Sequence, residues 1–357
     1  MKLAKIFLLY IGLMFFLPNI IYAKDNDSAS IYYNQGLNYG KQGKYELAIS
    51  AFTKAIDLNP KFAYAYNGRG IAYVKKEMTD LAFADFNKAI ELDPKYAEAY
   101  TCRGNIYEIK GEYDKALVDH NKALKINPQL ADAYSNRGNV YKELEKYDQA
   151  ITEQNKAIAL NPKFAKAYYN RGLAHDKKGE YDKAILDWTK AIELNPNDTD
   201  AYICRGNNYT DKGSYELALL DFNKGIKITP NNALAYYDRG LAYAKSKKYE
   251  PAIKDFNQAI AIKPKYAEAY TDRGHVYIDL GKYKHAISDC SKAIEINPKY
   301  SDAYYFKAYA SEKLGRKKEA IDAYQKYIKY APQKNIYLKD KYLIEQAKLR
   351  IIELQKR

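Results

Sequence analysis

Residues 165–198 read AKAYYNRGLAHDKKGEYDKAILDWTKAIELNPND, and this pattern recurs along most of the 357-residue chain. Nine of the eleven prolines keep a spacing of 34 residues: Pro60, Pro94, Pro128, Pro162, Pro196, Pro230, Pro264, Pro298 and Pro332. A fixed period of this length is typical of tandem structural repeats. If each proline is position 32 of its repeat, nine repeats follow one another without a gap: 29–62, 63–96, 97–130, 131–164, 165–198, 199–232, 233–266, 267–300 and 301–334.

The composition of the repeat indicates two helices. Position 4 is tyrosine in all nine repeats, position 8 is glycine in eight, and position 20 is alanine in all nine. Positions 4, 8 and 11 share one face of a helix, as do positions 20, 24 and 27, and small residues at 8, 20 and 27 let two helices approach closely. Repeat 2 departs at the turn, where residues 77–79 lack the usual glycine and tyrosine. Each repeat is therefore predicted to be a helix–turn–helix, in an all-α chain.

The motifs Tyr-x-x-x-Gly-x-x-Tyr in the first helix and Ala-x-x-x-Phe-x-x-Ala in the second, with proline at position 32, resemble the tetratricopeptide repeat (TPR). The resemblance implies a right-handed superhelical solenoid of stacked hairpins, whose first helices line a concave face. It also implies that residues 335–357 form a C-terminal capping helix, with Ile344, Ala347, Ile351 and Leu354 covering the last hairpin.

Residues 1–23 have the form of a secretory signal peptide. Two lysines precede an apolar run over residues 6–17, and Ala23 is a small residue at the expected cleavage point. A membrane anchor is the alternative interpretation, but this apolar run is too short for a membrane-spanning helix, which needs about 20 residues. We expect cleavage after Ala23, a linker over residues 24–28, and an exported protein without an integral membrane segment. The expected location is a bacterial periplasm or cell envelope, with full secretion as the alternative.

Seven repeats carry an arginine at position 7 and an acidic residue at position 23. The pairs are Arg69 with Asp85, Arg103 with Asp119, Arg137 with Glu153, Arg171 with Asp187, Arg205 with Asp221, Arg239 with Asp255, and Arg273 with Asp289. The first and last repeats lack both the arginine and the acid. A stripe that binds a polyanion is one interpretation, but the matched absence favours structural ion pairs across the seam between the two helices.

The concave face of the resembled family is formed by positions 2, 5, 6, 9, 12 and 13, and these positions vary here among the repeats. The candidate partner-binding residues are Asn34, Asn136, Asn170, Tyr33, Tyr169, Tyr237, Tyr305, Asp238, Asp272 and His275. By resemblance, the asparagines grip a peptide backbone, because an amide both donates and accepts hydrogen bonds. Tyrosines are enriched at binding hot spots, and the acids of repeats 6 to 9 predict a preference for a basic segment. The alternative, that these side chains only cover the neighbouring helix, stays open.

The sequence does not predict an enzyme, a cofactor or a metal site. No glycine-rich phosphate loop follows a strand, and His275 and His285 do not have the i, i+4 spacing of helical metal ligands. Three cysteines leave at least one thiol outside any disulfide framework. His120 occupies core position 24, where we expect a buried histidine with its hydrogen bonds satisfied.

The function predicted from these features is a scaffold or adaptor that binds a protein or peptide partner in the concave groove. One alternative is a secreted factor that binds a host protein. Another rests on charge: the net charge is +14, and residues 307–357 carry 14 basic and 6 acidic residues. This basic end could bind a polyanion or a membrane surface. Lysines on the solvated side of a packed helix explain the excess equally well, so no nucleic acid is expected as a partner.

Overall fold

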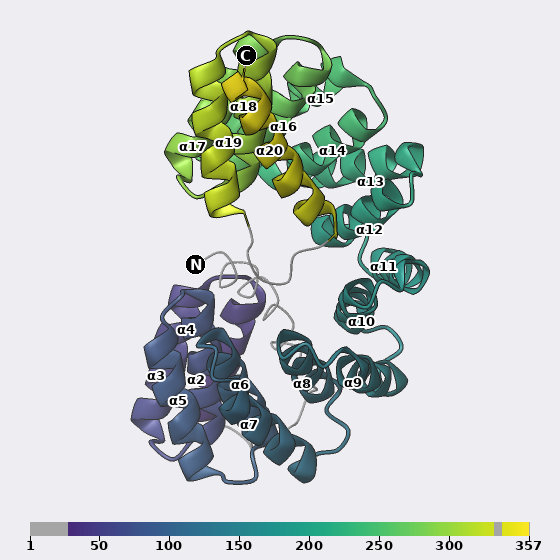
Figure 1. Cartoon of the computed structure of the whole chain (residues 1–357). Helices are drawn as coiled ribbons and strands as arrows, with labels where there is room; N and C mark the ends of the chain where they lie inside the picture. Colours follow the sequence, from purple (N-terminus) through teal and green to yellow (C-terminus); the bar gives the residue numbers. More distant parts are fainter. Residues whose placement is uncertain (1–27, 332–337, 357) are drawn as a thin grey trace. The chain divides into compact units, whose positions relative to one another are not determined.

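The computed structural model describes residues 28–331 and 338–356, and every regular element in these ranges is a helix (Figure 1). The prediction of an all-α chain of helical hairpins is therefore confirmed. The predicted signal peptide and residues 24–27 of the linker lie outside the described ranges. No helix among the described residues is both long enough and apolar enough to cross a bilayer.

Each repeat contributes one hairpin. The first helices are α2 (Ser28–Lys41), α4 (Ala63–Lys75), α6 (Ala97–Ile109), α8 (Ala131–Glu143), α10 (Ala165–Lys177), α12 (Thr199–Asp211), α14 (Ala233–Lys245), α16 (Ala267–Asp279) and α18 (Ser301–Lys313). The second helices are α3 (Tyr45–Leu58), α5 (Thr79–Leu92), α7 (Tyr113–Ile126), α9 (Tyr147–Leu160), α11 (Tyr181–Leu194), α13 (Tyr215–Ile228), α15 (Tyr249–Ile262), α17 (Tyr283–Ile296) and α19 (Lys317–Tyr330). A last helix, α20 (Leu338–Lys356), follows the ninth hairpin.

The hairpins form two compact units that divide between Pro196 and Asn197. Unit 1 contains α2 to α11, and unit 2 contains α12 to α20. Within each unit, a first helix contacts its own second helix and the second helix before it. It also contacts the first helix of the next repeat in that unit, for example α6 on α8. The first helices of a unit therefore lie side by side in one layer.

The close approach of the two helices in a hairpin depends on the glycine at position 8. A Cβ atom added to Gly70 would lie 2.6 Å from the ring of Phe86, and one added to Gly172 would lie 2.7 Å from the indole of Trp188. The alanines at position 20 are at most 1% exposed in all nine repeats. The large side chain at position 24 thus fills the space that small residues leave between the helices, as close packing of the interior requires.

The turn inside each hairpin needs a left-handed residue at position 15. Six repeats supply glycine there with φ between +70° and +75°, as at Gly111. Three repeats instead force a larger residue into this conformation: Glu77 (φ 62°), Glu145 (φ 58°) and Lys247 (φ 60°). A residue with a Cβ atom is strained in this region, so these three turns are less stable than the glycine turns.

The helix α20 packs on α19 and covers the end of unit 2. Ile344, Ala347 and Leu354 are buried in one cluster with Tyr324 and Tyr327. Burial of this apolar stripe removes the exposed hydrophobic surface that the last hairpin would otherwise present to water.

Candidate binding face

The seam between the two helices of a repeat carries a two-pronged ion pair. In repeat 3, the Nε atom of Arg103 donates to Oδ2 of Asp119 at 2.8 Å, and its Nη2 atom donates to Oδ1 at 2.8 Å. All seven arginines that the sequence pairs with an acid make this contact with that acid. The carboxylates are only 3% to 7% exposed, and the hydrogen bond that Arg103 donates to Asp119 raises the pKa of Arg103. These are fork-to-carboxylate pairs, the geometry for which arginine is suited.

Six of the arginines also contact two further groups that sequence reasoning missed. Nη1 of Arg103 donates to Oδ1 of Asn87, on the second helix of the preceding repeat, at 2.9 Å. Its guanidinium lies 5.6 Å from the ring centre of Tyr100 at position 4. The same asparagine contact recurs in four more repeats: Arg137 with Asn121, Arg171 with Asn155, Arg239 with Asn223, and Arg273 with Asn257. The arginines therefore join neighbouring hairpins, and their donors are occupied within the chain.

The tyrosine at position 4 is explained by the same contact. In all seven arginine-bearing repeats, the guanidinium lies 5.4 to 5.9 Å from the centre of this ring, a cation–π arrangement. In the last repeat Lys307 replaces the arginine, and its Nζ atom lies 3.5 Å from Oε1 of Glu319. The recurrent signal that could have revealed the wider network is the polar residue sixteen residues before each arginine, which is asparagine in five repeats and threonine before Arg69 and Arg205.

One core position differs from its prediction. His120 is fully buried against Gly104, but neither ring nitrogen has a hydrogen-bond partner in the described part of the chain. The expectation of a satisfied histidine is therefore wrong. Phenylalanine fills this slot in four other repeats, so the imidazole sits in a place shaped for an apolar ring. Burial lowers the pKa of His120 to about 3, which keeps it neutral.

The opposite side of the first helices presents the variable positions 2, 5, 6, 9, 12 and 13, which we call the helix-A face. Three of its four predicted tyrosines make ring contacts with other aromatic side chains. Tyr33 lies 5.0 Å from Phe62 between ring centres, and Tyr305 lies 5.2 Å from Tyr327. Burial raises the pKa of Tyr33 to about 12. Tyr237 lies 5.0 Å from Tyr266. These rings contribute to packing as well as to the surface.

The fourth tyrosine, Tyr169, is buried, with 6% of its surface exposed. It lies on α10, next in the chain to Asn170.

The three predicted asparagines occupy different environments. Asn34 is exposed on α2. Asn136 is buried and accepts a hydrogen bond from Nζ of Lys166 at 3.1 Å. Asn170 is buried and donates to Oγ of Ser135 at 3.2 Å. Two of the three amides therefore already bond within unit 1.

The predicted acidic residues lie in a network on unit 2. Tyr237 donates from its hydroxyl to Oδ2 of Asp272 at 2.6 Å. Asp238 accepts a hydrogen bond from Asn207 at 3.0 Å, and burial raises the pKa of its carboxyl to about 7.

His275, on the same helix as Asp272, is exposed. Its ring stacks on Phe306 at 4.3 Å between ring centres. The structure thus brings Tyr237 and Asp272 together, while His275 belongs to a separate aromatic contact.

A second group on the helix-A face was not predicted. The side-chain oxygens of Asn67, Asn105, Glu108 and Asn139 are buried, yet within the described residues they have no hydrogen-bond partner. Burial raises the pKa of Glu108 to about 8. Such groups are rare in native proteins and each needs an explanation. Their missing partners depend on three-dimensional neighbours, which periodicity does not reveal.

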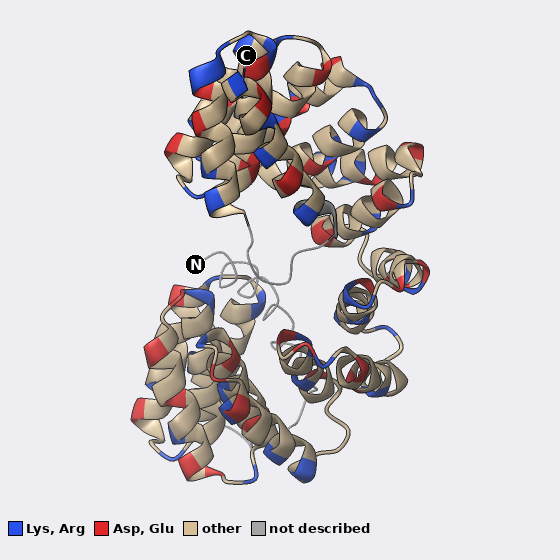
Figure 2. Ribbon diagram, in the orientation of Figure 1, with Lys and Arg blue, Asp and Glu red and all other residues tan. Residues whose placement is uncertain are grey.

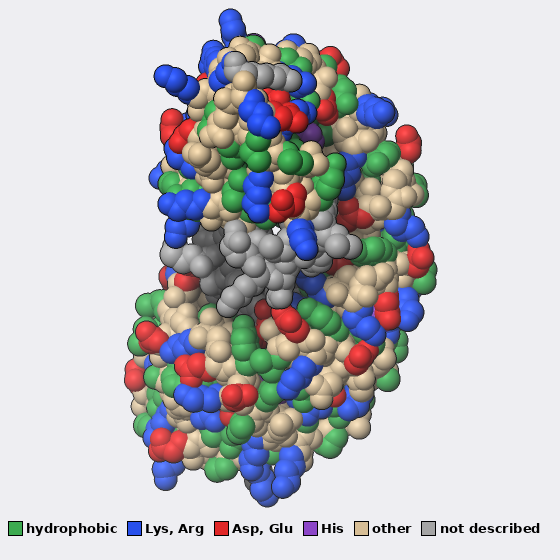
Figure 3. Space-filling view, in the orientation of Figure 1, with side chains coloured by type: hydrophobic (Ala, Val, Ile, Leu, Met, Phe, Trp, Pro, Cys, Tyr) green, Lys and Arg blue, Asp and Glu red, His purple; other side chains and the backbone are tan. Residues whose placement is uncertain are grey.

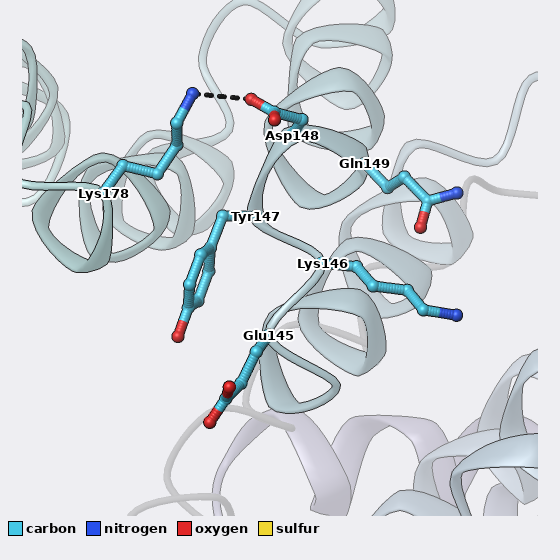
Figure 4. A pocket seen from close by; sticks show the side chains of 6 residues that line it. All are labelled: Glu145, Lys146, Tyr147, Asp148, Gln149 and Lys178. Atoms are coloured by element: carbon cyan, nitrogen blue, oxygen red, sulfur yellow. Dashed lines mark hydrogen bonds and ion pairs between the residues drawn. The ribbon is translucent and has the colours of Figure 1, made fainter. Parts of the chain in front are cut away.

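One surface depression of about 310 Å³ lies in unit 1 at the turn between α8 and α9. Figure 4 shows Lys178 paired with Asp148, at 2.6 Å, while Lys146 and Gln149 point away from Tyr147. These side chains do not converge on one point, unlike those of a substrate pocket. Among the described residues, no three His, Cys, Asp or Glu side chains are placed to hold a metal ion.

Charges of both signs alternate along the helices of both units (Figure 2). On the face visible in Figure 3, basic and acidic side chains are interspersed. This distribution resembles an ordinary solvated surface on that side.

Comparison with known proteins gives matches to TPR models along the chain. Models described as tetratricopeptide repeat match residues 29–62, 63–96, 86–118, 165–198, 233–266, 267–300 and 301–334. A model described as TPR repeat matches residues 104–145, 138–179 and 206–247. A comparison with curated proteins returns no match.

Solved structures share the fold. The APC/C hetero-tetramer Cut9–Hcn1 is 17% identical, with a TM-score of 0.58 over 92% of this chain and 78% of that chain. A tetratricopeptide repeat protein from Parabacteroides merdae is 21% identical, with a TM-score of 0.58 over 71% of this chain and 98% of that one. YrrB, described as a TPR protein with an unusual peptide-binding site, is 31% identical, with a TM-score of 0.43 over 52% of this chain and 95% of that chain.

Proposed function

Because the chain belongs to the tetratricopeptide repeat family, we propose that it is a scaffold that binds a protein or peptide partner on the helix-A face. The observation that carries this proposal is a contrast between two surfaces of the same helices. The seam residues recur from repeat to repeat, and their polar groups are paired within the chain. The helix-A face differs among repeats and keeps buried acceptors without partners in the described chain. A surface whose residues differ among repeats that share one fold is available to bind a partner.

We infer in addition that the scaffold works outside the cytoplasm, in a bacterial periplasm or envelope. The signal-like sequence of residues 1–23 supports this location. Mass spectrometry of the protein from fractionated cells would test it. A chain that begins at Lys24 in the envelope fraction is the expected result, and an intact Met1 start in the cytoplasm would contradict it.

Affinity capture from a cell-envelope extract tests the binding role. The baits are residues 24–357 and a variant with Tyr237→Phe, Asp238→Asn and Asp272→Asn, which removes one hydroxyl and two carboxyl groups of the helix-A face while nearly keeping side-chain volume. A matched control, Asp57→Asn with Asp114→Asn, changes two exposed acids on second helices. All baits need equal thermal unfolding midpoints before their captures are compared.

A stoichiometric protein that is retained by the parent and the control but lost by the variant is the expected result. Equal retention by all three baits would show that the substituted part of the helix-A face does not bind it. Capture of salt-sensitive nucleic acid or lipid alone would contradict the scaffold and favour binding through the basic C-terminal end, because counterion release makes such binding depend on salt.

A further inference from the structure

We propose that Asn105, Glu108 and Asn139 form a subsite for one basic side chain, lysine or arginine, of the bound partner. The inference rests on the proposed function and specifies the chemistry of the partner at one place on the helix-A face. It starts from acceptor oxygens that the described chain leaves without donors. Both carboxylate oxygens of Glu108 and the Oδ1 atoms of Asn105 and Asn139 are in this state. The three residues are 5% to 6% exposed.

The three side chains lie on two neighbouring helices. Asn105 and Glu108 are three residues apart on α6, which places them on the same face of that helix. Asn139 is the residue equivalent to Asn105 in the next repeat, on α8, and α6 contacts α8. The three side chains therefore come from two helices that lie side by side in one layer.

The fold itself does not require polar groups at these places. Position 9, held by Asn105 and Asn139, is leucine at Leu173 and Leu241. Position 12, held by Glu108, is valine in repeat 2. Hairpins of the same kind therefore close with apolar residues at these positions. Other repeats also carry polar residues there, such as Asn207 at position 9 and Glu312 at position 12. A buried acceptor without a donor is unfavourable and calls for an explanation. A donor supplied by the bound partner is the explanation proposed for these three residues.

Two lysines of the chain lie close enough to Glu108 to interact with it electrostatically, and both also have other partners. Nζ of Lys142 lies 3.1 Å from Oε1 of Glu143, and Nζ of Lys166 donates to Asn136 at 3.1 Å. Both lysines favour the charged form of Glu108 electrostatically, yet neither makes a hydrogen bond to it. The side-chain oxygens of Glu108 therefore have no hydrogen-bond donor among the described residues.

A positive charge suits this site better than a neutral donor. In its ionised form Glu108 contributes two acceptor oxygens and the amides contribute one each, while an ammonium or guanidinium group carries donors only. A buried carboxylate is stabilised when a cation pairs with it and satisfies its lone pairs. A basic side chain on an extended partner meets both needs.

The test uses peptide display on the full chain, with a library of random twelve-residue peptides. The parent is compared with a variant that carries Asn105→Leu, Glu108→Val and Asn139→Leu, the residues of sister repeats. Asp114→Asn, on the exposed side of a second helix, is the control. One peptide selected on the parent is then synthesised with each basic residue replaced by a neutral analogue, citrulline for arginine or acetyl-lysine for lysine.

The inference predicts one required basic residue in peptides selected on the parent. Neutralising it should weaken binding to the parent and to the control about tenfold or more, and to the triple variant less than about twofold. The triple variant should also unfold at a higher temperature than the parent, because it loses unpartnered buried polar groups.

Three results would overturn the inference. Selected peptides without a required basic residue would contradict the subsite but not the proposed scaffold function. A preference for a basic residue that the triple variant keeps would have the same meaning. A lower unfolding temperature of the triple variant would show that the three residues serve the fold. No selected peptide at all would count against both the subsite and the proposed function.

Discussion

The seam and the helix-A face are two sides of the same first helices, and they differ in how completely their polar side chains are hydrogen-bonded. On the seam, Arg103 bonds to Asp119 in its own repeat, to Asn87 in the preceding repeat, and stacks near Tyr100. On the helix-A face of the same helix, Glu108 is buried without a hydrogen bond in the described chain. Satisfied polar groups that recur in every inner repeat serve the fold. Unsatisfied groups that occur in one or two repeats are candidates for binding.

The largest expected effect comes from breaking the seam. Replacing Arg103 with leucine leaves Asp119 buried without its partner, and should lower the free energy of unfolding by about 3 kcal/mol. Adding Asp119→Leu should recover much of this loss, since both charges are then gone. Thermal unfolding of the parent, the two single variants and the double variant measures the coupling. An unfolding midpoint of the Arg103→Leu chain equal to that of the parent would show that the pair does not stabilise the fold.

A smaller effect is expected inside the hairpin, where His120 interrupts an otherwise apolar slot. His120→Phe should raise stability by about 1–2 kcal/mol at pH 7, because it removes a buried polar ring without partners and supplies the residue of the sister repeats. The neighbouring repeat with Phe86 shows that phenylalanine fits opposite the glycine.

The same substitution makes a prediction for pH. The folded histidine stays neutral down to about pH 3, while the unfolded residue binds a proton near pH 6.5. The contribution of His120 to stability is therefore fully present above pH 6.5 and is lost as the pH falls from there toward 3. The advantage of His120→Phe should grow by about 1.4 kcal/mol for each pH unit below 6.5. A difference in stability between variant and parent that stays constant from pH 7 to pH 5 would contradict the buried neutral state.

The smallest effect is expected at the turns inside the hairpins. Glycine recurs at position 15 of six repeats, and a larger residue replaces it in the other three. Glu145 adopts φ 58° where other repeats have glycine. Glu145→Gly should raise stability by about 0.5–1 kcal/mol, because the relief of strain exceeds the entropy that glycine loses on folding. Gly111→Ala is the matched control and should have the opposite sign. A lower unfolding temperature for Glu145→Gly would show that the glutamate contributes more than its conformation costs.

The sequence predicts the fold and the seam pairs because both depend on periodic spacing. Arginine and acid are always sixteen residues apart and disappear together, so the pair is visible without coordinates. The contact of Arg103 with Asn87 has the same separation in the opposite direction, but it joins two different repeats. The spacing therefore predicts both contacts of the arginine, but the spacing within one repeat reveals only the pair with the acid.

The binding face is less predictable for a physical reason. Asn136 and Asn170 match a known pattern, yet the structure pairs them with Lys166 and Ser135. Asn105 and Glu108 belong to no recurrent motif of the repeat, and only the arrangement of neighbouring helices leaves their side-chain oxygens without donors among the described residues. Whether a polar group is satisfied depends on every side chain around it, so spacing along one helix does not determine it.

The central claim is that the two sides of a first helix have different roles, and one measurement addresses it directly. Arg103→Leu and Glu108→Val lie on the same helix, α6, and remove one ionisable side chain each from opposite sides. Thermal unfolding of both single variants beside the parent compares the two sides. We predict that the first variant unfolds at a lower temperature than the parent and that the second unfolds at a higher one. A lower unfolding temperature for both would show that the helix-A face, like the seam, is needed for the fold.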